Sequence, residues 1–213
     1  MNGRCAKKSA ARVPGARLEL AQSAVYLPQA AKAVAHVGLA PVGEVGLLAV
    51  VLRYSQAVWA QWVDHNASSA DFGEALVLAA RHFGGAPRRW VFEEADCRVL
   101  HWDGRRACFA ELIEVVAQQT ASSLSLWHDR YCGPATCACE RLIWEMPCPR
   151  WRERLRAGNA ALRQLLHETL PNWPHPQQPS RSVAEVFAEE RVELLPLPKA
   201  WATLDGLSRG GRE

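Results

Sequence analysis

The chain has 213 residues, of which 49% are hydrophobic and 22% charged, with a formal net charge of +3. This length and apolar content suffice for one sizeable core with an appendage and exclude several large domains. The mildly basic balance is compatible with DNA contact but is far from a histone-like composition. No stretch is long and apolar enough to span a bilayer, and no apolar run of the secretory type follows the basic N-terminus. We therefore expect a cytoplasmic protein without membrane contact.

The seven cysteines are an odd number, which favours reduced thiols over a disulfide framework. A group of four raises the question of zinc: Cys132, Cys137, Cys139 and Cys148. Structural zinc sites usually use two close ligand pairs, whereas this spacing fits no standard knuckle. Buried or incidental thiols are the favoured interpretation, and a small zinc-stabilised interaction protein built around these cysteines stays open as an alternative.

The first third of the chain predicts a meander of strands. Residues 1–20 are basic and aperiodic and are expected to form a loose tail. A first strand is expected over residues 31–38. Residues 45–54 are a β-branched apolar run typical of a buried strand, and residues 57–63 suit a third strand. Ser55-Gln56 would make the short hairpin connection between the last two.

A helix and a short strand follow. Ser68 and Asp71 form a helix start signal, and apolar residues then recur at helical spacing up to Phe83. Gly84-Gly85 ends this helix. After the turn at Ala86-Pro87, a short fourth strand is expected over residues 90–92.

The middle of the chain alternates strands and helices. A strand and turn are expected over residues 98–104, an amphipathic helix over 109–118 and a short strand over 123–127. Further helices are expected over residues 137–144 and, most clearly, over 151–170. This order of elements is an α/β layout with a leading antiparallel meander.

The C-terminal region predicts an appendage to a core formed by residues 21–148. The appendage covers residues 149–198, and its prolines from 171 to 179 suggest an extended linker. Ser182 and Glu185 then stand three apart, as in a capping box, ahead of a short helix up to Glu190. Residues 199–213 are expected to be a frayed tail.

Two phrases carry a family resemblance. The first is His82-Phe83-Gly84-Gly85-Ala86-Pro87-Arg88-Arg89-Trp90-Val91-Phe92-Glu93. The second is Ser182-Val183-Ala184-Glu185-Val186-Phe187-Ala188-Glu189-Glu190-Arg191, ahead of Leu194-Leu195-Pro196-Leu197-Pro198. In this order they resemble the IstA-type transposases of bacterial insertion sequences, over residues 45 to 198. No segment resembles the helix-turn-helix that this family places before its core.

The resemblance implies a fold, an activity and partners. The fold is a ribonuclease-H-like mixed sheet with flanking helices, and the activity is DNA strand transfer by a retroviral-integrase-like core. Its partners would be DNA, further copies of the chain, or an ATPase helper protein of the transposon. The cofactor would be Mg²⁺ or Mn²⁺, because two divalent cations hold the attacking and leaving oxygens of the phosphodiester in line.

The family's three metal-binding acids, Asp, Asp and Glu, correspond by resemblance to His36, Glu93 and Glu140. A neutral imidazole at His36 is a poor Mg²⁺ ligand. Glu93 keeps the charge but extends its carboxylate by one methylene, in a site that tolerates little misplacement. The resemblance makes these three residues the catalytic candidates, with Glu93 and Glu140 as metal ligands. A mixed set of nitrogen and oxygen ligands could still accept Mn²⁺ or Zn²⁺.

Each of these three residues also has an ordinary interpretation. His36 would be a satisfied or exposed histidine, Glu93 part of a solvated pair at a strand end, and Glu140 part of a surface helix face. The clustered arginines are likewise either solvated surface or phosphate contacts. The candidates for DNA contact are Arg88, Arg89, Arg141, Arg150, Arg152 and Arg154.

The sequence thus predicts a DNA transposition or integration protein whose strand-transferase core has lost catalytic acids. The alternative is a non-catalytic module that binds DNA or assembles with a transposase.

Overall fold

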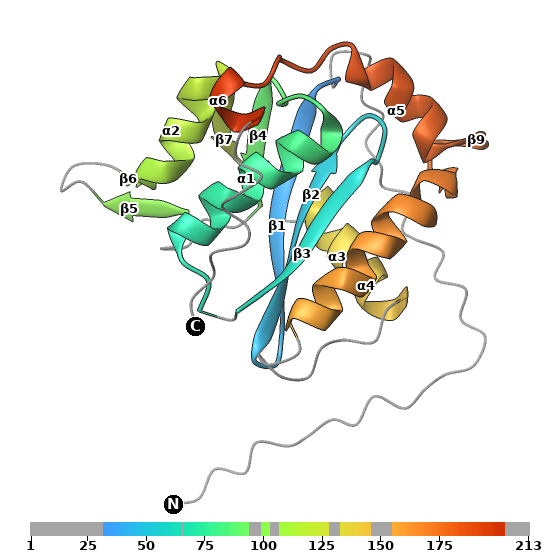
Figure 1. Ribbon diagram of the computed structural model, residues 1–213, viewed down its shortest axis with the longest axis horizontal. Helices are drawn as coiled ribbons and strands as arrows, with labels where there is room; N and C mark the ends of the chain where they lie inside the picture. The colour runs from blue at the N-terminus through green and yellow to red at the C-terminus, as the bar shows by residue number, and fades with distance from the viewer. Residues whose placement is uncertain are drawn as a thin grey trace, which may run out of the picture.

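A five-stranded mixed sheet organises the fold (Figure 1). A computed structural model describes residues 32–64, 66–93, 99–102, 107–127, 133–145 and 155–202. The sheet order is β3-β2-β1-β4-β7. Its strands are β1 (Val34–Val42), β2 (Val45–Leu52), β3 (Val58–Asp64), β4 (Arg89–Phe92) and β7 (Ser123–Leu126).

The strand directions follow from the connections. β1, β2 and β3 form an antiparallel meander, whereas β4 and β7 run parallel to β1. Gly43, with a φ of 65°, occupies the tight turn between β1 and β2, where a left-handed conformation matches the twist of the strands. β2 is buried along its whole length, as its continuous apolar sequence predicts.

Helices cover both faces of the sheet (Figure 1). α1 (Ser69–Phe83) and α2 (Glu111–Thr120) contribute to the core that contains Val37, Val50 and Trp90. α3 (Pro134–Glu145) and α4 (Leu155–Glu168) pack on the other face, around Leu47 and Trp62.

The predicted boundaries of α1 are confirmed. Ser68 accepts a hydrogen bond from the backbone of Asp71, and the Asp71 side chain in turn accepts from the Ser68 backbone. Gly84 ends the helix with a φ of 73°, and its N–H donates to carbonyls of the last turn. The capping box of Ser182 and Glu185 is confirmed in the same way at the start of α5 (Val183–Arg191).

The remaining elements are small. β5 (Leu100–Trp102) pairs with β6 (Ala107–Phe109), and residue 109 belongs to this strand rather than to the helix α2 that was expected to include it. The predicted extended linker over residues 171–179 is wrong. The 3₁₀ turn η3 (Leu170–Asn172) leads instead into a hairpin of β8 (Pro174–His175) and β9 (Gln178–Ser182).

His175 explains why this hairpin packs on the core. Its side chain is buried, Nδ1 accepts a hydrogen bond from the N–H of Gln177, and Nε2 donates to the carbonyl of Tyr54 at 2.9 Å. The segment expected to be a frayed tail begins with the short helix α6 (Lys199–Ala202). There Trp201 is buried and donates from Nε1 to Gln119.

Glu190 holds the C-terminal region to the sheet. Its carboxylate is fully buried and accepts hydrogen bonds from the backbone N–H groups of Ala33 and Ser55, both at 2.8 Å. A few residues later the chain forms a backbone bridge between Leu195 and Ala86. The segment after residue 149 is therefore packed against the core over its described part.

The predicted tail over residues 1–20, the stretch 146–154 and residues 203–213 lie outside the described part of the chain. Within the described part, no helix has the length and apolar character needed to cross a membrane.

Candidate functional site

The sheet brings His36 and Glu93 together, as the resemblance implies. β1 and β4 are parallel neighbours, with His36 opposite Val91. The N–H of Glu93 donates to the carbonyl of Val37 at 2.9 Å, which extends the pairing past the end of β4. His36 Nδ1 lies 3.1 Å from Glu93 Oε1, and the two side chains are 0% and 2% exposed.

The Glu93 carboxylate caps the N-terminus of α3. It accepts from the N–H of Ala135 at 2.7 Å and from the N–H of Thr136 at 2.8 Å. The Thr136 hydroxyl adds a third bond at 2.7 Å. The first helical residue is Pro134, which has no N–H, so the carboxylate satisfies the next two free donors of the helix. A negative charge at this end also interacts favourably with the helix dipole.

Two glycines make room for this arrangement. A Cβ atom on Gly38 would lie 3.0 Å from Glu93 Oε2 and 3.1 Å from the Cβ of Ala135. A Cβ atom on Gly133 would overlap the carboxyl group of Glu93 itself. The approach of Glu93 to the start of α3 therefore depends on the absence of a side chain at Gly133, whereas a Cβ atom at Gly38 would make tight contacts that need small shifts of its neighbours.

Glu93 is ionised at neutral pH despite its burial. Burial alone would raise the pKa of Glu93. The hydrogen bonds from His36, Ala135 and Thr136 stabilise the charged form more strongly, so the net effect lowers this pKa below its usual value. Four hydrogen-bond donors thus stabilise the buried negative charge of Glu93.

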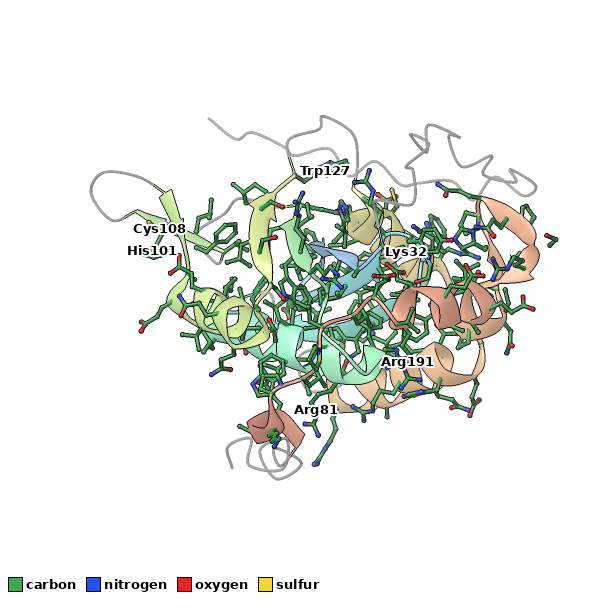
Figure 2. All side chains as sticks on the ribbon, turned by 90° about the horizontal axis from the view of Figure 1, so that it is seen from above. Lys32, Arg81, His101, Cys108, Trp127 and Arg191 are labelled. Carbon is green, nitrogen blue, oxygen red and sulfur yellow. The ribbon has the colours of Figure 1, made fainter. Side chains whose placement is uncertain are left out.

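His36 is held by the same carboxylate. Since an ionised carboxylate only accepts hydrogen bonds, Nδ1 carries the proton and donates it to Glu93. Nε2 is buried without a hydrogen-bond partner among the described residues. The imidazole packs edge-on against Trp127, with ring centroids 5.0 Å apart, and the Arg53 guanidinium lies 5.4 Å from the Trp127 ring centroid. Trp127 follows the end of β7, at the rim of the described fold (Figure 2).

Glu140 is not joined to this pair. It lies on α3 one turn beyond Thr136 and is exposed, and it makes no hydrogen bond or ion pair with another described residue. Its neighbour Cys139 is buried instead, with Sγ 3.2 Å from the carbonyl of Leu47. Position 139 therefore packs α3 on the sheet, while Glu140 points away from that contact.

The residues present do not fit the divalent ions that the resemblance implies. Mg²⁺ is hard and needs several oxygen ligands at near-octahedral geometry. Both oxygens of Glu93 are already engaged by donors, and His36 offers a single buried nitrogen. Among the described residues, no three His, Cys, Asp or Glu side chains are grouped so that they could hold a metal ion. Of the proposed zinc ligands, Cys132 and Cys148 lie outside the described residues, and Cys137 and Cys139 form no disulfide.

The arginines predicted to contact DNA are dispersed. Arg88 donates from Nε to the carbonyl of Glu193 at 3.1 Å, with the Glu193 carboxylate 3.8 Å away. Arg141 stacks over the ring of Trp173, 3.5 Å from its centroid. Arg89 is exposed at the start of β4, about 13 Å from Glu93 along the strand. Arg150, Arg152 and Arg154 lie outside the described residues.

Sequence reasoning missed Thr136, Gly133 and Trp127 as parts of this site. One signal was available for the first two. Gly133-Pro134 opens a helix with no Ser, Thr, Asp or Asn at the capping position, so the first free N–H groups need an acceptor from elsewhere in the chain. No comparable signal identified Trp127.

A solved structure shares the fold described above. The catalytic core domain of BIV integrase superposes with a TM-score of 0.50 at 12% sequence identity, and covers 76% of this chain and 97% of that domain. The chain has the fold of an integrase catalytic core. Neither a protein-family model nor a curated protein matches it. The fold predicted from the sequence is therefore confirmed, an α/β ribonuclease-H-like mixed sheet with flanking helices.

Proposed function

We propose that this chain is a DNA integration or transposition protein, of IstA-like type, whose core binds DNA and does not transfer strands. One observation carries the second half of this proposal, namely that the Glu93 carboxylate is committed to the N-terminus of α3. The ribonuclease-H-like sheet and the sequence phrases support the first half.

Strand transfer makes specific demands at the positions of His36 and Glu93. Two cations must be held by several carboxylate oxygens so that an attacking hydroxyl and a leaving oxygen lie in line. A carboxylate that binds a cation there must exchange its hydrogen bonds to Ala135 and Thr136 for metal ligation. The helix would then lose its cap at the same moment, and His36 would lose its acceptor. The loss of the α3 cap and the loss of the His36 acceptor both oppose metal binding in this chain.

The test is nicking of supercoiled plasmid in Mg²⁺ and in Mn²⁺, with duplex binding measured in EDTA. We expect the native chain to bind DNA in EDTA and to nick nothing. The double variant His36→Asp/Glu93→Asp places an aspartate at each of the two positions where the resembled family has one. It is the matched gain-of-function variant. Nicking by the native chain that disappears in Glu140→Gln would show a working triad and overturn the proposal.

A second candidate function is assembly with a transposase or with further copies of the chain. The observation that favours it is Trp144 on α3, whose side chain is 81% exposed. Large aromatic side chains often occupy the centre of protein interfaces. Sedimentation of the native chain beside Trp144→Ala would test this candidate, because a self-associating native chain should become monomeric in the variant.

A further inference from the structure

At the outer edge of the sheet, a side chain of α4 hydrogen-bonds the backbone of β3. β3 is an outer strand, and Asn159 of α4 bonds both backbone groups of Trp62. Its Oδ1 accepts from the Trp62 N–H at 2.7 Å, and its Nδ2 donates to the Trp62 carbonyl at 2.9 Å. The side of α4 that carries Asn159 therefore faces the open edge of β3.

Helix geometry places three basic side chains next to Asn159. At 3.6 residues per turn, Arg156, Arg163 and His167 fall within an arc of about 40°, which begins about 40° from Asn159 and lies on the side away from Leu162 and Leu166. The buried positions Leu162 and Leu166 lie on the sheet-facing side. We call Arg156, Arg163 and His167 the basic flank of α4.

A contact across the sheet edge supports this orientation independently. The ring of His167 lies 5.3 Å, centroid to centroid, from the ring of His82. His82 belongs to the last turn of α1, which packs on the opposite face of the sheet from α4. The basic flank thus runs along the edge of β3 from Trp62 toward the end of α1.

The two arginines of this flank form no ion pair within the described residues. Arg156 and Arg163 are exposed, and neither makes a hydrogen bond or ion pair with another described residue. Within α4, the positions three and four residues from either arginine are Asn, Ala, Leu or His. The acid of α4, Glu168, lies on the other flank and accepts from Gln164. On β3, Asp64 accepts from the N–H of Asn66 in the turn that follows the strand.

We propose that the basic flank of α4 binds the phosphodiester backbone of duplex DNA. Arg156 and Arg163 are seven residues apart, which is about 10 Å along the helix, and a duplex strand carries one phosphate about every 3.4 Å of its axis. Two flexible guanidinium groups at this separation reach phosphates on one face of a duplex. This inference rests on the proposed function and names its DNA-contacting surface, which differs from the arginines expected from the sequence.

The experiment measures the affinity of the full chain for a fluorescent duplex of about 30 base pairs in EDTA, at salt concentrations from about 50 to 200 mM. The test variant is Arg156→Gln/Arg163→Gln. The matched control is Arg191→Gln/Lys199→Gln, which removes the same charge from exposed side chains of α5 and α6. Removing one arginine–phosphate contact lowers the salt slope of log K by about 0.9. We expect the slope to fall by about two in the test variant, with about tenfold weaker binding at the lowest salt concentration, and to stay unchanged in the control.

Each outcome decides between the two proposals. Duplex binding by the native chain with equal slopes in both double variants would overturn the basic flank and leave the proposed function standing. Absence of duplex binding by the native chain at the lowest salt concentration would overturn both. Displacement of the duplex by poly-glutamate at equal charge concentration would reassign the flank to an acidic protein partner. Circular dichroism of each variant confirms that the fold is kept, which is expected because the substituted side chains are surface groups outside the core clusters.

Discussion

Replacing the carboxylate that caps α3 is the most informative perturbation of the site. Glu93→Gln keeps the size and shape of the side chain and removes its charge. In the native chain, Oε1 accepts from His36 and Ala135, and Oε2 accepts from the N–H and hydroxyl of Thr136. An amide has a single acceptor oxygen, so whichever way it turns, two donors lose their charged acceptor, and its NH₂ group faces the backbone N–H of Ala135 or of Thr136, which cannot accept.

The number of hydrogen bonds lost gives the expected change in the free energy of unfolding. Glu93→Gln removes two charge-assisted hydrogen bonds, and each is worth about 1.5–3 kcal/mol when the acceptor is charged. The Glu93 side chain is 2% exposed, so water replaces neither bond. We expect the free energy of unfolding to fall by about 3 kcal/mol, which corresponds to about 6–12 °C in Tm for a chain of this size.

The assay is urea unfolding followed by tryptophan fluorescence at pH 7, with the slope m as a check that the unfolded state is unchanged. Glu145→Gln, an exposed acid on the same helix, is the control and should leave the midpoint in place. Because the pKa of Glu93 is lowered in the folded chain, its contribution is present above the unfolded value near 4.5 and is lost as the pH falls through the folded pKa. A Glu93→Gln variant as stable as the native chain at pH 7 would refute the assignment of Glu93 as the cap of α3.

Three further predictions use stability measurements. Gly133→Ala should lower the free energy of unfolding by about 1–3 kcal/mol, because its Cβ would displace the Glu93 carboxyl group; an unchanged urea midpoint would contradict this. Burial raises the pKa of Glu190 despite its bonds to Ser55 and Ala33, so its stabilisation is present at low pH and lost as the pH rises through the folded pKa. Chemical unfolding from pH 4 to 8 should therefore show that the free energy of unfolding of Glu190→Gln rises relative to that of the native chain as the pH rises. Burial, and then the neighbouring His167, lowers the pKa of His82 to about 4, so the native chain should lose about 3 kcal/mol between pH 7 and pH 4 from this group alone. His82→Gln should flatten that part of the pH profile, and an identical profile would contradict the assignment.

The sequence predicted the sheet because its signals there are local. The apolar run of β2, the capping box at Ser68 and the left-handed Gly84 each lie within a few residues of the feature that they predict. Periodicity and turn chemistry are sufficient in such cases.

The site could be predicted only in part because its decisive contacts are distant in sequence. The resemblance assigns His36 and Glu93 to one site, and His36 Nδ1 lies 3.1 Å from Glu93 Oε1. It gave no indication that Thr136, 43 residues further along, would occupy the Glu93 carboxylate, since that requires α3 to approach over Gly38. The basic side chains show the same limit. Arg141 stacks on Trp173, a packing role that its charge does not reveal.

The bonds of Glu190 also determine when the protein can fold during its synthesis. The N–H groups of Ala33 and Ser55, at the two ends of the first hairpin, find their acceptor 157 and 135 residues later in the chain. Ala86, just before β4, is paired with Leu195. A ribosome must therefore release nearly all of the described chain before the backbone groups that flank the first hairpin acquire their partners. Until then, two backbone donors beside the apolar meander lack their acceptor, and the contact with Glu190 that supplies it closes loops of 157 and 135 residues.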